Sequence, residues 1–113
     1  MSKFDEKVAT YSKFMDDKGL KYNADLLAAV TKGLGPSIYK ADAETVSGSD
    51  AKELATVKNN FLIKKLGLAD APKLDEAINA VVEKIGKSER KKYRAVVYYM
   101  LAEHFNKQDV YGM

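Results

Sequence analysis

The fold is decided by residues 87–105, which read KSERKKYRAVVYYMLAEHF. Ser88 is placed to cap a helix, because its hydroxyl can accept from backbone N–H groups one turn further on. Steps of three and four then put one stripe of residues on a single helical face: Tyr93, Val96, Val97, Met100, Leu101 and His104. Tyr98, Tyr99 and Phe105 lie elsewhere on the helical wheel. A helix that is apolar nearly all round is usually buried on more than one side, so we predict that the other helices pack around this one.

The start of this predicted helix is unusually basic. Its first two turns set five cations against the single acid Glu89: Lys87, Arg90, Lys91, Lys92 and Arg94. A helix N-terminus carries partial positive charge, and each exposed cation there costs roughly 0.3–1 kcal/mol. Helix stability alone therefore does not explain the pattern. Either the cations form a solvated turn that acids elsewhere neutralise, or they are exposed to meet something negative.

Length and charge favour one small domain. The 113 residues are close to the common size of a single domain, and we expect one helical domain over residues 1–113. Residues 1–82 balance 12 lysines against 12 acids, whereas residues 83–113 hold 7 Lys and Arg against 4 acids, which gives the whole net charge of +3. The last segment of the chain is therefore the one whose charge calls for an explanation.

Neither a membrane span nor a secretory signal is expected. No run of about 18 apolar residues occurs, and the first residues, MSKFDEKVATYSKF, lack the continuous apolar core of a signal peptide. The chain has no cysteine, which excludes disulfides and thiolate chemistry and fits a reducing compartment. These features predict a cytoplasmic protein that does not contact a membrane.

Four more helices are predicted where apolar residues recur in steps of three and four: residues 3–18, 24–32, 51–66 and 74–85. Asn23 is the expected cap of the second helix. Asp50 and Glu53 have the spacing of a capping box at the start of the third. Gly86 ends the fourth, and Ser88 would begin the last helix almost at once. So short a joint predicts a helical hairpin or a helix-turn-helix corner near Gly86.

Residues 33–50 separate the two halves of the chain. Two glycines and Pro36 break any long element, and short helical turns are expected at residues 36–39 and 42–46. We expect three apolar side chains to hold this segment on the core: Ile38, Tyr39 and Val46. The tail from about residue 106 is expected to fray. No segment alternates as strands do, so the predicted fold class is all-α, a single compact bundle of four to six helices.

Three stretches together resemble a known family. They are residues 1–15 (MSKFDEKVATYSKFM), residues 30–68 (VTKGLGPSIYKADAETVSGSDAKELATVKNNFLIKKLGL) and residues 92–105 (KYRAVVYYMLAEHF). The chain is similar over nearly its full length to bacterial proteins of about this size, catalogued as a domain of unknown function. The resemblance implies a small helical protein and carries over no catalytic or binding residues.

The basic segment is the candidate site for an anion or a nucleic acid. Six side chains could contact phosphates: Lys84, Lys87, Arg90, Lys91, Lys92 and Arg94. A recognition helix after the corner at Gly86 would present its first residues to a groove of DNA. The chain carries no full motif of a nucleic-acid-binding family, so a solvated basic turn is the competing interpretation. The glycines at Gly33 and Gly35 could add a backbone cradle for an anion, although they serve equally well as a helix stop and a turn.

The candidate contacts for a protein partner are Tyr98 and Tyr99, because tyrosine is enriched at interfaces. The alternative is that both pack against other helices of the same bundle. His104, the only histidine, is expected to be a packed core residue. No Cys/His cluster suggests a metal, and no cofactor or catalytic residue is predicted. The sequence therefore favours a small non-catalytic binding or regulatory module that acts through protein contact, with nucleic-acid binding through residues 84–94 as the alternative.

Overall fold

The structure is a computed structural model that describes residues 3–48, 50–86, 88, 89 and 91–112. The α-helices in this part of the chain are α1 (Lys3–Asp17), α2 (Ala24–Gly33), α3 (Ala41–Glu44), α4 (Ala51–Thr56), α5 (Pro72–Ile85) and α6 (Arg94–His104). Helical segments of other kinds are η1 (Gly35–Tyr39), η2 (Val57–Ile63) and η3 (Gln108–Tyr111). No strand occurs among the described residues. The predicted all-α class is confirmed.

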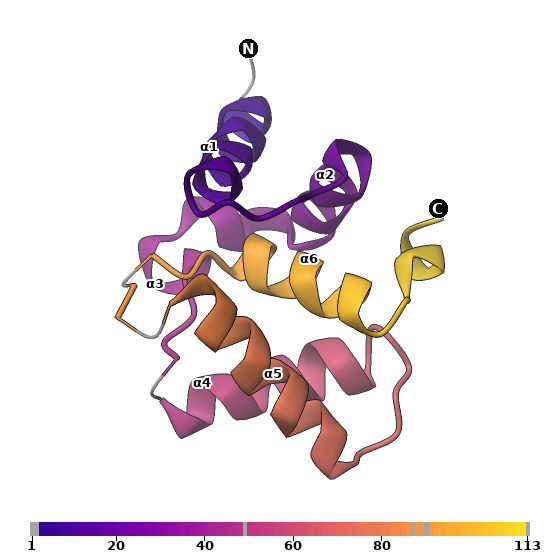
Figure 1. Ribbon diagram of the computed structural model, residues 1–113. Coiled ribbons are helices and arrows are strands. Elements are labelled where there is room, and N and C mark those ends of the chain that lie inside the picture. Colours follow the sequence, from indigo (N-terminus) through magenta and orange to yellow (C-terminus); the bar gives the residue numbers. More distant parts are fainter. Residues whose placement is uncertain (1–2, 49, 87, 90, 113) are drawn as a thin grey trace.

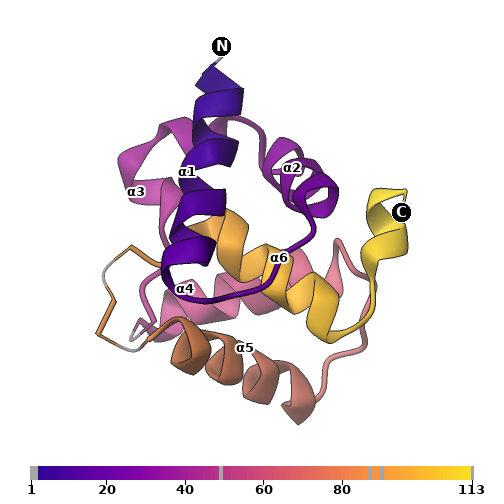
Figure 2. The same ribbon diagram turned by 45° about the horizontal axis from the view of Figure 1, so that its top comes forward.

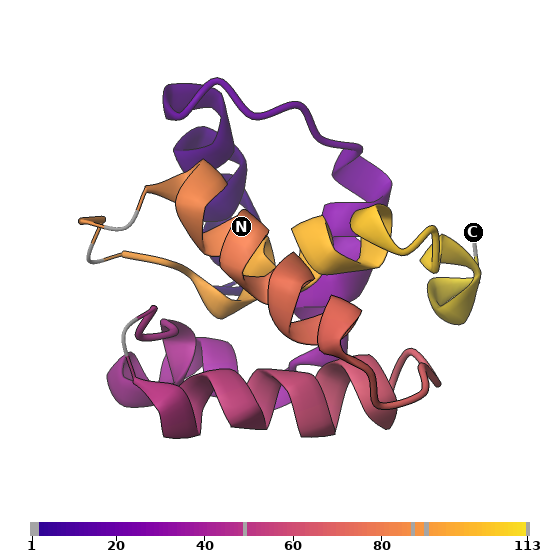
Figure 3. The same ribbon diagram turned by 60° about the horizontal axis from the view of Figure 1, so that its bottom comes forward.

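Helix α6 runs through the middle of the molecule (Figure 1). Helices α1 and α2 lie on one side of it, and α4, η2 and α5 lie on the other. The connection between α1 and α2 passes over α6 in Figure 2, and α5 packs against α6 in Figure 3. The final helix is thus the element around which the others are arranged, as its apolar character predicts.

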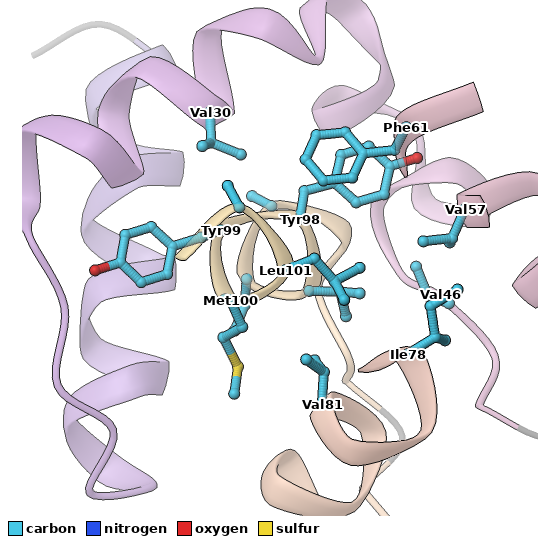
Figure 4. Close-up of a cluster of buried hydrophobic side chains, with 14 of the residues drawn as sticks. Val30, Val46, Val57, Phe61, Ile78, Val81, Tyr98, Tyr99, Met100 and Leu101 are labelled. Carbon is cyan, nitrogen blue, oxygen red and sulfur yellow. The ribbon is translucent and has the colours of Figure 1, made fainter. Parts of the chain in front are cut away.

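The burial of α6 is complete along most of its length. Every residue from Ala95 to Ala102 is buried. Tyr99 points toward α1 and α2, whereas Leu101 points toward the helices on the other side (Figure 4). Burying a large apolar side chain contributes roughly 1.5–3 kcal/mol, so a helix buried on all sides supplies a large share of the core. This explains why α6 forms although nothing caps its first residue with a side chain.

Local signals account for the other helix ends. The Asn23 side chain accepts from the N–H groups of Asp25 and Leu26 at 2.9 and 3.2 Å, and so begins α2 as predicted. Gly86 ends α5 with a φ of +118°, a backbone conformation that side chains disfavour. The predicted apolar stripe of α5 is buried throughout: Leu74, Ile78, Val81, Val82 and Ile85.

The predicted start of the last helix is wrong. Helix α6 begins at Arg94, and Ser88 caps nothing in α6. Thr45 instead pairs with Tyr93 in an isolated antiparallel bridge, and the Val46 N–H donates to the Lys92 carbonyl at 2.7 Å. Because this pairing draws residues 92 and 93 into extended backbone, the connection from α5 to α6 spans residues 86–93 and is not a tight corner. The helix start therefore excludes Lys91 and Lys92, in line with the cost of cations at that end.

The predicted helix over residues 51–66 is present but not uniform. It begins as α4, and η2 continues it as a π-helix. Asp50 caps it by accepting from the Lys52 N–H at 2.9 Å. The predicted capping box is wrong, because the Glu53 carboxylate is bound to Arg94 of α6 instead. In the wider π-helix, the Phe61 ring stacks on Tyr98 with the ring centroids 4.0 Å apart.

Two further expectations need correction. Tyr39 does not hold residues 33–50 on the core, because 48% of its surface is exposed, although Ile38 and Val46 are buried as predicted. The described residues after 106, which end at residue 112, are not frayed, because η3 packs against α2. The Tyr111 ring comes within 3.4 Å of the place that a Cβ on Gly33 would occupy. Gly33 therefore serves packing as well as ending a helix.

Candidate functional site

The side chain of Arg94, one of the six predicted anion contacts, points into the molecule and is bound by three groups of the same chain. Its Nε donates to the Ala43 carbonyl at 2.8 Å, and its Nη1 donates to the Tyr98 hydroxyl at 3.2 Å. Its Nη2 forms an ion pair with Glu53. Burial alone would lower the Arg94 pKa, but the contacts with Tyr98 and Glu53 outweigh it and raise that pKa. The guanidinium thus joins α3, α4 and α6, and its charge is neutralised from within.

Lys92 is also turned inward. Only 3% of its surface is exposed, and its Nζ donates to the Glu89 carbonyl. Its stem passes so close to Gly48 that a Cβ there would lie 3.1 Å from the Lys92 Cε. The same segment is tied to the residue that follows α1 by the ion pair of Glu89 with Lys18 at 2.8 Å, which holds the pKa of the Glu89 carboxyl below its usual range.

The remaining cations of this set do not share one environment. Lys84 and Lys91 are exposed, while Lys87 and Arg90 lie outside the described residues. Of the four that the structure describes, two therefore face solvent and two are packed inside. The structure does not gather these four into one basic face.

Tyr98 and Tyr99, the predicted partner contacts, are both buried. Tyr98 stacks on Phe61, and the Tyr99 hydroxyl accepts from the Asn23 N–H at 2.6 Å. Burial and the neighbouring Glu103 carboxylate raise the pKa of Tyr99 to about 12. Packing within the bundle, the alternative interpretation of this pair, is what the structure shows.

His104 is not the packed core residue that its place in the apolar stripe predicts. Its side chain is exposed, because α6 ends at this residue and a hollow opens beside it. The imidazole lies edge-on to the ring of Phe105. The only histidine therefore belongs to the surface, at the opposite end of α6 from Arg94.

The hollow at His104 lies between the α1–α2 connection, α5 and the end of α6, with a volume of about 240 Å³. Four largely buried apolar side chains form its floor: Met15, Leu20, Val81 and Met100. Figure 4 shows two of them, Met100 from α6 and Val81 from α5, pointing toward one another. The exposed rim carries Lys21, Lys84, Glu103 and His104. Because these floor residues are almost fully buried, the surface that the hollow exposes is slightly more polar than apolar.

A second hollow of about 320 Å³ continues the first along α5. Both are lined by Ala80 and His104, and the second adds Lys73, Glu76, Ala77 and Phe105. We call the two together the α5 groove. Three lysines stand against two glutamates on its rim, so the charge is mixed with a small positive excess.

Sequence reasoning missed the α5 groove because three separate segments build it, residues 15–21, 73–84 and 100–105. A partial signal was available. The apolar stripe of α5 fixes which side of that helix is buried, so the side with Lys73, Ala80 and Lys84 is left toward solvent. What the stripe cannot give is the hollow, which depends on where α6 ends.

Metal and membrane sites find no support among the described residues. They contain no group of three or more His, Cys, Asp or Glu placed to hold a metal ion. None of their helices has the length and apolar character needed to span a bilayer.

Comparison with known proteins finds one family. A family described as "Protein of unknown function (DUF2853)" matches residues 10–109. The match begins within α1, includes the helices from α2 to α6 in full, and ends within η3. The search of curated proteins found no match.

Proposed function

The chain belongs to this family of unknown function, and from that premise we propose that it is a small non-catalytic binding module that holds a segment of a partner protein in the α5 groove. The observation that carries the proposal is the groove itself. Its apolar floor, mixed-charge rim and continuity along a helix are what a partner segment needs for burial and for orientation.

The site of contact differs from the one expected from the sequence. Tyr98 and Tyr99 are inside the bundle and offer nothing to a partner. Ala80 and His104 are exposed and lie where the two hollows meet. The proposal therefore keeps the kind of function and moves it from the aromatic residues of α6 to the groove beside its end.

Nucleic-acid binding through residues 84–94 has weaker support. Of its described residues, Lys92 and Arg94 are held by contacts within the chain, which leaves Lys84 and Lys91 exposed. Within the described part of this segment, two exposed lysines would supply little of the phosphate contact on which such binding depends. Titrating a labelled DNA duplex at low salt tests this alternative, and salt-sensitive binding that Lys84→Ala and Lys91→Ala weaken would favour it.

A bacterial origin and a place in the cytoplasm complete the proposal. The absence of cysteine fits a reducing compartment, and the resemblance of three stretches to bacterial proteins supports the origin. Fractionation of cells that express the tagged protein from its own promoter is the direct measurement.

The test of the groove uses two matched substitutions. Ala80→Arg puts a long charged side chain at the junction of the hollows, whereas Ala9→Arg makes the same change on the exposed face of α1. Both alanines are exposed and inside helices, so both variants should fold and melt like the parent. We expect proteins retained from a lysate of the source organism by the parent and by Ala9→Arg to be lost with Ala80→Arg. An unchanged set of proteins with Ala80→Arg would refute the groove as the site.

A further inference from the structure

One row of residues along α5 is suited to a helix. Lys73, Ala77, Ala80 and Lys84 follow one another in steps of three and four, so they lie along this row. Ala77 is buried, and the other three are exposed. Eleven residues at a rise of about 1.5 Å put the two lysines about 16 Å apart, or roughly three helical turns. The groove is thus long enough for a short helix and has a charge at each end.

The middle of the row allows a close approach. Ala80 is exposed and has no side chain beyond Cβ, so a partner backbone can come near α5 at this point, at the short end of the usual 8–10 Å between helix axes. An extended segment would gain little here, because the N–H and C=O groups inside α5 are already bonded within the helix. A helical occupant needs no free backbone groups from α5 and can cover the apolar floor with one of its faces.

The charges select the kind of helix. Lys73 and Lys84 mark the two ends of the row, and Lys21 adds a third cation near Lys84. A second copy of this chain fits poorly. Two α5 helices packed antiparallel with Ala77 against Ala80 would set Lys73 of each copy opposite Lys84 of the other. Like charges facing each other disfavour this pairing, so the occupant is expected to supply acids at both ends.

We infer that the α5 groove takes an amphipathic helix of another protein, with acidic residues about three turns apart and small or aliphatic residues between them. The inference rests on the proposed function and specifies its partner. Acids at the ends of the bound helix meet Lys73 and Lys84, and the residues between them lie over Ala77, Ala80 and the apolar floor. The glutamates of the rim disfavour basic segments and so add specificity.

The experiment selects helices without assuming the partner. A display library of peptides about 18 residues long, built on a helix-favouring sequence, is selected on the parent protein and depleted on Ala80→Arg. The strongest peptides are labelled, and their affinity is measured by fluorescence polarisation for the parent, for Lys73→Glu/Lys84→Glu and for Lys52→Glu/Lys64→Glu. The last variant is the control, because it reverses two exposed lysines on α4 and beyond η2, away from the groove.

We expect the selected peptides to be rich in Asp and Glu at positions ten to twelve residues apart, roughly three turns. Their affinity should fall at least about tenfold with Lys73→Glu/Lys84→Glu and change less than about twofold with the control. Peptides that need Ala80 but carry no excess of acids, or that tolerate the charge reversal, would refute this inference and leave the proposed function in place. A selection that yields no peptide dependent on Ala80 would count against both.

Discussion

The two ends of α6 treat charge in opposite ways. At the first residue, Arg94 is held by three partners inside the molecule, and 12% of its side chain is exposed. At the last residue, His104 is exposed beside the α5 groove. A cation at a helix N-terminus opposes the helix dipole, whereas one at the C-terminus agrees with it. The end of α6 where a cation is unfavourable is therefore the end where the fold supplies an acid, Glu53, while the side chain at the other end faces solvent.

Among the changes that test this contrast between the two ends of α6, the largest loss of stability is expected from removing the Arg94 side chain. Arg94→Ala would leave the Glu53 carboxylate and the Ala43 carbonyl without their partner in a largely buried place. We expect the free energy of unfolding to fall by about 2–4 kcal/mol, out of a typical total of about 5–15. Urea denaturation followed by circular dichroism gives the value.

Two variants show whether this loss belongs to the ion pair. Lys91→Ala removes an exposed cation three residues away and should change stability by less than about 0.5 kcal/mol. Arg94→Ala combined with Glu53→Gln should cost less than the sum of the single changes, because the two side chains are in contact. Strict additivity would contradict the internal role of Arg94.

Unfolding at alkaline pH tests the burial of Tyr99 in the middle of α6. Tyr99 ionises near pH 10 when unfolded, whereas burial raises its pKa to about 12 in the folded chain. The folded state therefore keeps the Tyr99 proton up to a higher pH than the unfolded state does. The contribution of this proton to the free energy of unfolding is complete below pH about 10 and is lost as the pH rises to about 12. Tyr99 should contribute a loss of about 1.4 kcal/mol per pH unit in that range. Urea midpoints measured across it should fall less steeply for Tyr99→Phe. Tyr39→Phe, at an exposed tyrosine, is the control and should keep the parent's slope.

The smallest effect is expected at the far end of α6. His104→Ala should change the free energy of unfolding by less than about 0.5 kcal/mol, because the side chain is exposed. Thermal melts at neutral pH are sufficient to check it. A loss above about 1.5 kcal/mol would mean that the imidazole has a structural role, and the contrast between the two ends would disappear.

The parts of the fold that could be predicted are those with local causes. Asn23 caps α2 by contacts two and three residues away, and the stripe of α5 follows from the helical period alone. The start of α6 could not be found in this way. Its position depends on pairing between residues 45–46 and 92–93, and the partner of Arg94 is 41 residues distant. The cations at residues 87–92 would be unfavourable at a helix N-terminus. They indicated correctly that the helix does not begin there.

The sequence predicted the kind of function proposed for the site, which is contact with a partner protein, but not the residues that form the site. A sequence shows which residues are charged, but not whether the partner of a charge is inside the molecule or outside it. Lys92 and Lys84 look equivalent in the chain, yet one is buried and the other lies on the rim of the groove. His104 shares the period of buried residues and is exposed because its helix ends there.

The hydrogen bond from the Asn23 N–H to the Tyr99 hydroxyl has a consequence for how the groove would bind. It fastens the α1–α2 connection, which carries Lys21, to the most deeply buried helix. This wall of the groove is therefore preorganised, and the protein has little conformational freedom to lose there when an occupant arrives. The entropic cost of association would fall on the incoming helix, so a partner already folded should bind more tightly than a disordered one of the same sequence.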